Sequence, residues 1–81
     1  MNNCSSDKYT ITVPHRDTVL YCDEYCEVSF EVEINSTESV LWSKSSRCIK
    51  GDKKTFLAEI EKILHWLAEK FPNRKAVLDN A

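Results

Sequence analysis

The longest regular pattern of apolar and polar positions runs from Asp52 to Phe71 and predicts an amphipathic helix. At about 100° per residue the apolar side chains fall within one arc roughly 140° wide. They are Phe56, Leu57, Ile60, Ile63, Leu64, Leu67, Ala68 and Phe71. Asp52 suits the N-cap, because its carboxylate can accept from free backbone N–H groups, and Pro72 ends the helix. A helix of about 18 residues is roughly 27 Å long, enough to cover one face of a small sheet.

Period-two alternation ahead of this helix predicts β-strands. The clearest strand runs from Cys26 to Ile34, with one apolar face and with Glu27, Ser29, Glu31 and Glu33 on the other face. Such alternation is typical of an antiparallel sheet with one solvated face. Further strands are expected over residues 8–13, 18–22 and 40–43, and the last, which carries Trp42, has an alternative end at Ser46. The residues from 44 to 51 are expected to lead into the helix.

These elements predict an α+β fold in one domain over residues 1–81. Short links between consecutive strands favour a meander, so we expect an antiparallel sheet of three to four strands. One long C-terminal helix would pack on one face of that sheet. Residues 1–7 and 74–81 are expected to be flexible ends, although Val77 and Leu78 offer a contact to the end of the helix.

Composition excludes several functional classes. The chain has one glycine, whereas phosphate-binding loops and dinucleotide fingerprints need several. Eleven basic and thirteen acidic residues give a net charge of −2, so direct nucleic-acid binding is not expected. The N-terminal residues lack the features of a secretory signal, and no apolar run approaches the roughly 20 residues of a membrane span. We therefore expect a cytoplasmic protein without membrane contact.

The sequence predicts neither a metal site nor a catalytic site. The candidate zinc ligands by residue type are Cys4, Cys22, Cys26, Cys48 and His15. They contain one close pair, Cys22 and Cys26, without the second pair that a closed tetrahedral site would need. A disulfide between these two cysteines is geometrically feasible but is not expected in a reducing compartment, so Cys26 is interpreted as a buried thiol. His15 lies in a turn and His65 lies opposite the apolar arc, which leaves no base for a nucleophile. We expect no enzyme, no cofactor and no catalytic residue.

Charge is segregated along the chain. Seven acidic residues and no lysine or arginine lie between Asp17 and Ser43, whereas five basic residues lie between Lys44 and Lys54. Glu31 and Glu33 share one strand face at a spacing of about 6.8 Å. This spacing is close to the distance between successive phosphates of a nucleic-acid strand, whose rise of about 3.4 Å per nucleotide is lengthened by helical winding. The carboxylates could therefore occupy a basic groove that binds nucleic acid. The alternative is a solvated face whose charge deters edge aggregation.

Trp66 falls outside the apolar arc. Tryptophan is enriched at interface hot spots, so Trp66 is a candidate binding residue; alternatively it covers the sheet edge or the C-terminal tail. The candidate partner-binding residues are Glu24, Glu27, Glu31, Glu33 and Trp66.

The leading hypothesis is a small non-enzymatic protein-binding module that engages a basic protein partner through an acidic sheet face. In size and charge segregation the chain is similar in kind to phage or mobile-element inhibitors of nucleic-acid-processing defence systems, of the anti-restriction or anti-CRISPR type. One alternative is a self-associating structural or regulatory subunit, a homodimer formed through the helix face around Trp66. Another is a zinc-stabilised domain that contacts nucleic acid through the basic segment from Lys44 to Lys54.

Overall fold

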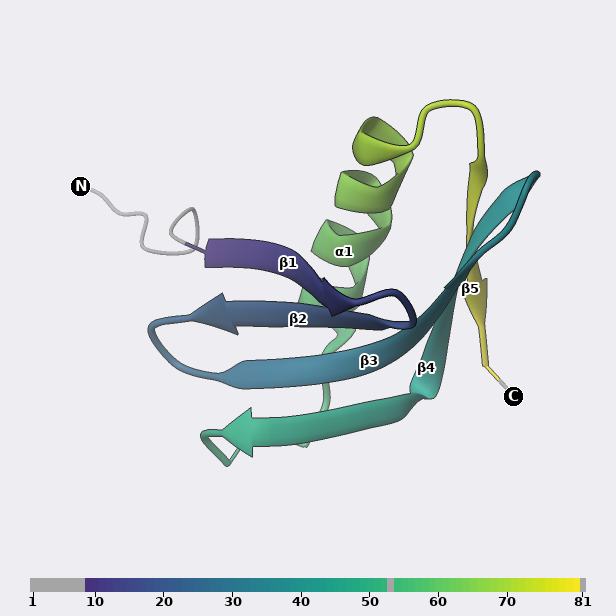
Figure 1. The fold of residues 1–81 in the computed structure, drawn as a ribbon. Coiled ribbons are helices and arrows are strands. Elements are labelled where there is room, and N and C mark those ends of the chain that lie inside the picture. Colours follow the sequence, from purple (N-terminus) through teal and green to yellow (C-terminus); the bar gives the residue numbers. More distant parts are fainter. Residues whose placement is uncertain (1–8, 53, 81) are drawn as a thin grey trace.

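The computed structural model describes residues 9–52 and 54–80, which form a five-stranded sheet with one helix on one face (Figure 1). The elements are β1 (Tyr9–His15), β2 (Thr18–Asp23), β3 (Glu27–Ile34), β4 (Glu38–Lys50), α1 (Leu57–Lys70) and β5 (Lys75–Asp79). Strands β1 to β4 form an antiparallel meander, and β5 pairs in parallel with β4. The predicted α+β fold with one C-terminal helix is confirmed. The prediction of a three- to four-stranded, purely antiparallel sheet is wrong.

The C-terminal segment forms a strand where a flexible tail was expected. Lys75–Asp79 pairs with the first half of β4, and the backbone N–H of Lys75 donates to the carbonyl of Thr37 at 2.9 Å. Leu78 lies beside Leu41 and packs against the core. A parallel partner needs a crossover connection, and α1 supplies it. Five residues of weak alternation do not reveal this pairing without the position of the helix.

The core lies between α1 and the inner face of the sheet. Its buried apolar side chains are Val19, Tyr21, Cys26, Val28, Phe30, Val32, Leu41, Phe56, Ile60, Ile63 and Leu67. Cross-strand pairing places Val19 beside Phe30 and Val32 beside Leu41, so the inward residues of neighbouring strands meet directly. The ring of Phe56 packs edge-on against that of Phe30, with 6.2 Å between centroids. The predicted apolar face of β3 is therefore confirmed as the centre of the core.

Helix α1 begins later than predicted and is rotated about its axis. It starts at Leu57, and Phe56 occupies the N-cap without a side-chain cap bond, so the predicted cap at Asp52 is wrong. The buried helical residues are Glu59, Ile60, Ile63 and Leu67. Leu57 is 76% exposed. At about 100° per residue, the buried arc is rotated by roughly 50° from the predicted one. The difference arises because Glu59 is buried beside Cys26 under the β2–β3 turn, whereas Leu57 is exposed.

Strand β4 extends past its predicted ends at residues 43 or 46 and bends in the middle (Figure 1). Trp42 pairs with Glu31 and Arg47 pairs with Ser29, so residues 43–46 stand opposite Phe30 alone. At this bulge the Ser45 hydroxyl accepts from the backbone N–H of Glu31 at 2.7 Å and donates to the carbonyl of Trp42 at 2.5 Å. A serine side chain thus replaces ladder bonds where the strand changes direction.

Gly51, which follows β4, is required by both conformation and space. Its φ is 98°, a left-handed conformation that side chains rarely adopt. A Cβ atom at this position would lie 2.7 Å from the backbone carbonyl oxygen of Tyr25. The chain therefore passes close beneath the β2–β3 turn before it reaches α1.

The orientation of the helix predicts which of its large aliphatic side chains contribute most to the free energy of unfolding. Ile63→Ala should lower the free energy of unfolding by about 2–5 kcal/mol, because Ile63 is 0% exposed and its loss leaves a cavity. Leu57→Ala on the same helix should change it by less than about 0.5 kcal/mol. Urea denaturation followed by circular dichroism measures both. Equal losses in the two variants would show that the helix is oriented as the sequence pattern suggests.

Candidate functional site

The sheet face turned away from α1, here called the outer face, is not covered by another element of the described residues 9–52 and 54–80 (Figure 1). Strand register arranges its side chains in rows that cross the sheet. The first row is His15, Thr18, Glu31, Trp42 and Asp79, and the second is Glu33, Val40 and Val77. The third row is Thr12, Leu20, Ser29 and Arg47, and the fourth is Thr10, Cys22, Glu27 and Lys50.

Charge divides the outer face into two halves. The first two rows carry three acidic residues around three apolar ones, and we call them the acidic half: Glu31, Glu33, Asp79, Trp42, Val40 and Val77. The other two rows carry Arg47 and Lys50, the latter directly across from Glu27. The acidic run and the basic run of the sequence thus meet on one surface, because the second half of β4 pairs with the start of β3. The predicted acidic face is therefore split: Glu31 and Glu33 lie in the acidic half, whereas Glu27 lies beside Lys50.

The predicted partner-binding residues are distributed over three places. Glu31 and Glu33 are exposed side by side on the outer face of β3. Glu27 is half-buried between Cys22 and Lys50, and Glu24 is exposed in the β2–β3 turn. Trp66 is half-buried against the core on the helical side of the sheet. Its predicted place outside the packing arc is wrong, because the rotation of α1 brings this side chain towards the sheet.

Trp42 is the residue that the candidate set lacked. It is half-buried in the first row, between Glu31 on β3 and Asp79 on β5. Neighbouring strands lie about 4.8 Å apart, so a carboxylate-bearing residue stands on each side of the indole. The sequence signal was the alternation of Val40 and Trp42. It was not sufficient, because the neighbours of Trp42 depend on the β4 bulge and on a strand that was expected to be a tail.

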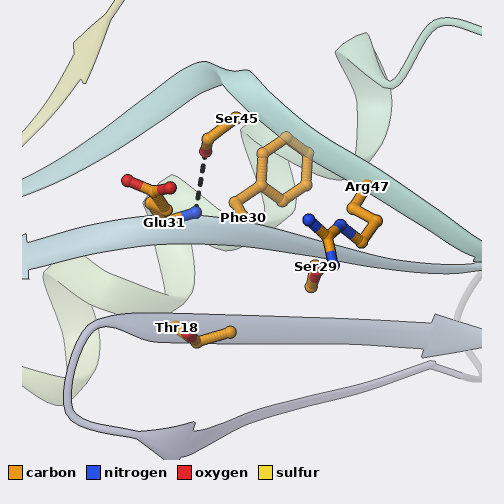
Figure 2. A pocket seen from close by; sticks show the side chains of 6 residues that line it. All are labelled: Thr18, Ser29, Phe30, Glu31, Ser45 and Arg47. Atoms are coloured by element: carbon orange, nitrogen blue, oxygen red, sulfur yellow. Dashed lines mark hydrogen bonds between the residues drawn. The ribbon is translucent and has the colours of Figure 1, made fainter.

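A hollow of about 280 Å³ opens on the outer face where β4 bends (Figure 2). It is lined by Thr18, Ser29, Phe30, Glu31, Ser45 and Arg47. Figure 2 shows the Glu31 carboxylate and the Arg47 guanidinium on opposite sides of this hollow. The ring of Phe30 is buried in the core, so the lining is largely hydroxylic and charged. The hollow marks the border between the acidic half and Arg47.

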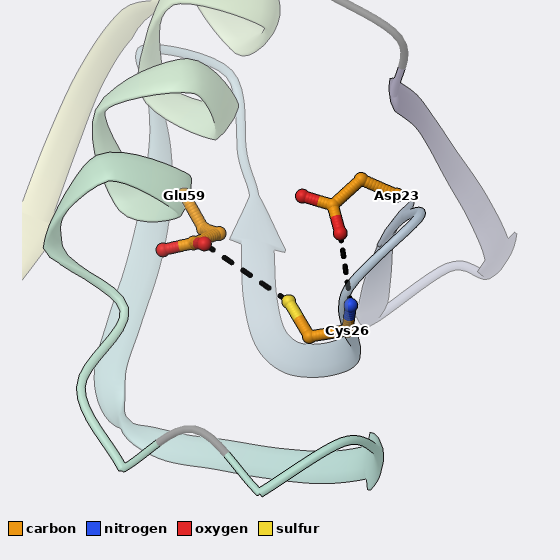
Figure 3. Close-up of side chains that lie close together, drawn as sticks. All are labelled: Asp23, Cys26 and Glu59. Carbon is orange, nitrogen blue, oxygen red and sulfur yellow. Dashed lines mark hydrogen bonds between the residues drawn. The ribbon is translucent and has the colours of Figure 1, made fainter. Parts of the chain in front are cut away.

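A second group of polar side chains lies under the β2–β3 turn (Figure 3). Ligand-type atoms of Asp23, Cys26 and Glu59 lie within 4.8 Å of one another. One Asp23 oxygen accepts from the backbone N–H groups of Tyr25 and Cys26 at 2.8 Å, and the other accepts from the Tyr21 hydroxyl at 2.7 Å. The Cys26 thiol lies 4.0 Å from Glu59 Oε2. Asp23 thus holds the turn through one oxygen and Tyr21 of β2 through the other, and the contact between Cys26 and Glu59 connects the turn to α1.

The candidate zinc ligands do not form this group. Cys22 pairs with Thr10 at one end of the β1–β2 hairpin, whereas His15 pairs with Thr18 at the other end. Cys22, Cys26 and Cys48 are free thiols, and Cys4 lies outside the described residues. Of the candidate ligands within residues 9–52 and 54–80, Cys26 alone lies in the Asp23–Cys26–Glu59 group.

The pKa of the Tyr21 hydroxyl is raised well above its ordinary value. Burial is the main cause of the rise, and the hydrogen bond to Asp23 and the nearby negative charge add to it. The ammonium group of Lys62 lies 3.5 Å from the same hydroxyl and 4.8 Å from the centre of the Tyr9 ring. Tyr21 thus links β2, the turn and the helix, since its neutral hydroxyl donates to Asp23 and accepts from Lys62.

Comparisons with protein-family models, with curated proteins and with solved structures find no match. Helix α1, the helix of the described residues, is neither long nor apolar enough to cross a membrane.

The β4 bulge predicts unequal effects for two neighbouring serines. Ser45→Ala should lower the free energy of unfolding by about 0.5–1.5 kcal/mol, because it removes the acceptor for the Glu31 N–H and the bond to Trp42. Ser46→Ala, at an exposed position of the same bulge, should change it by less than about 0.5 kcal/mol. Thermal and urea unfolding compare the two. A neutral Ser45→Ala would contradict the role given to its hydroxyl.

Tyr21 predicts a loss of stability at alkaline pH. Because its pKa is raised in the folded state, the folded protein retains this proton more tightly than the unfolded chain. The resulting stabilisation is complete below pH about 10 and decreases above it, by at most about 1.4 kcal/mol per pH unit. Tyr21→Phe should be less stable at pH 7, since it removes the hydrogen bond from the Tyr21 hydroxyl to Asp23, and should lose less stability between pH 10 and pH 12. Parallel slopes in denaturant titrations of both proteins would contradict this assignment.

Proposed function

We propose that this protein is a non-enzymatic binding module that receives a basic protein surface on the acidic half of its outer face. The observation that carries the proposal is the pair of exposed carboxylates, Glu31 and Glu33, beside a half-buried apolar strip. That strip consists of Val40, Trp42 and Val77. The groups present are suited to contact between surfaces, since they are carboxylates, an indole and two aliphatic side chains.

The arrangement has the anatomy of a protein interface. Such interfaces combine an apolar or aromatic centre with a polar rim, and tryptophan is enriched among the residues that dominate binding energy. Complementary charge then sets the rate of encounter and the register of the partners. Here Trp42 supplies the centre, and Glu31, Glu33 and Asp79 supply the rim. Charge complementarity selects a partner rich in lysine or arginine.

A nucleic-acid-binding groove of another protein is the concrete form of basic surface that we propose. Glu31 and Glu33 are two residues apart on a regular part of β3, which gives a spacing of about 6.8 Å. A nucleic-acid strand presents phosphates at a comparable pitch. A protein that fills such a groove would compete with the nucleic acid, as inhibitors from phages and mobile elements do.

Arg47 and Lys50 limit where the partner sits. They lie on the same face, across from Ser29 and Glu27, and would repel a basic surface placed over the third and fourth rows. The proposed footprint is therefore displaced towards the first two rows, and Lys75 of β5, which pairs with Glu38, limits it on the far side. Glu27, which stands across from Lys50, contributes less to this footprint than Glu31 or Glu33.

The test compares two variants with the same change in net charge. Glu31→Lys with Glu33→Lys reverses the acidic half, and Glu61→Lys with Glu69→Lys reverses exposed positions on α1. The probe is a fluorescent 16-residue peptide of alternating basic residues and serine, followed by anisotropy. The outer-face variant should lose at least tenfold in affinity and the helix variant less than threefold, and wild-type affinity should fall with added salt.

Because both variants change the net charge equally, a difference between their affinities for the peptide shows which surface binds it. An equal loss in both would mean that the peptide senses only overall charge, and the proposal would be abandoned. Circular dichroism of each variant provides the control for folding, since exposed charges contribute little to stability individually.

A further inference from the structure

We infer that the row formed by Glu31, Trp42 and Asp79 is a subsite for a guanidinium group, so that an arginine side chain anchors the partner. This inference rests on the proposed function and adds the identity of the recognised group. The row places one aromatic ring between two carboxylate-bearing residues on adjacent strands. Neither the acidic residues nor the tryptophan would define the ligand alone.

The chemistry of the row distinguishes arginine from lysine. Among side-chain rings, the indole binds a cation over its face most strongly. A guanidinium is planar, so it can stack on that face while its N–H groups point outwards to carboxylates on both sides. With strands about 4.8 Å apart, Glu31 and Asp79 are within reach of a group centred over Trp42. An ammonium group is tetrahedral, so it has neither a plane that stacks on the ring nor donors fixed within that plane.

The neighbouring rows do not provide an equivalent position. The second row has Val40 where the first has Trp42, so it provides apolar contact and the single charge of Glu33. The third row contains Arg47, which borders the hollow and repels a second cation. The first row is thus the place on the outer face where a ring and flanking carboxylates coincide. Glu33, about 6.8 Å from Glu31 along β3, would meet a second basic residue of the partner.

The experiment uses two peptides of equal length and charge, one with arginine and serine alternating and one with lysine and serine alternating. The full chain should bind the arginine peptide about two- to fivefold more tightly, the range expected for an exposed cation–π contact. Trp42→Leu should abolish this preference while charge-driven binding of the lysine peptide remains. Glu31→Gln and Asp79→Asn should each reduce the preference.

Two controls separate the subsite from general effects. Glu38→Gln removes a carboxylate from β4 at a position that pairs with Lys75 and does not flank Trp42, so the arginine preference should survive. Trp66→Phe leaves Trp42 as the sole tryptophan. In that background the arginine peptide should change the indole fluorescence, even if Trp42→Leu fails to fold.

The outcomes distinguish this inference from the proposed function. If both peptides bind equally well and the fluorescence of Trp42 does not respond, the guanidinium subsite is wrong, while binding of basic surfaces still stands. If neither peptide binds, the proposed function and the subsite both fail. An arginine preference that persists in Trp42→Leu would also overturn the subsite, because the preference would then arise elsewhere.

Discussion

The register of β4 is the constraint on which the rest of the structure depends. This strand pairs with β3 over both of its halves and with β5 over the first half, and the bulge at residues 43–46 sets the offset between the halves. Side chains alternate between faces with a period of two, so a shift of one residue would exchange the inner and outer sets. The present register buries Leu41 and turns Trp42 outwards. The core and the candidate binding face therefore follow from the same pairing.

Helix α1 covers the inner face of the sheet. It also connects β4 to β5, the strand that contributes Val77 and Asp79 to the outer face. Its buried side packs over the inner face, and the turn after it places β5 beside β4. At the opposite end of the helix, Glu59 lies against Cys26 below the turn that Asp23 holds. The helix is thus attached at both ends, which leaves the outer face as the broad uncovered surface of the described chain. That surface is where the proposed partner would bind.

The alternation of β3 was sufficient to predict its two faces, because strict period-two patterning admits one arrangement. The helix was also predicted, but its rotation was not, since the burial of Glu59 beside Cys26 depends on the β2–β3 turn. The candidate site was predicted in part. Glu31 and Glu33 were identified from spacing, whereas the row that includes Trp42 and Asp79 requires a bulge and a parallel pairing. Both are long-range features that local pattern does not encode.

Glu31, Trp42 and Asp79 stand side by side on the outer face, and the proposed binding mode depends on this arrangement. Cross-strand nuclear Overhauser contacts measure this directly in the full chain. The account predicts contacts between the backbone protons of Glu31 and Trp42 and between those of Trp42 and Asp79, with the indole remote from the ring of Phe56. Contacts from Trp42 to the side chains of Phe56 or Ile63 would place the indole in the core and contradict the account.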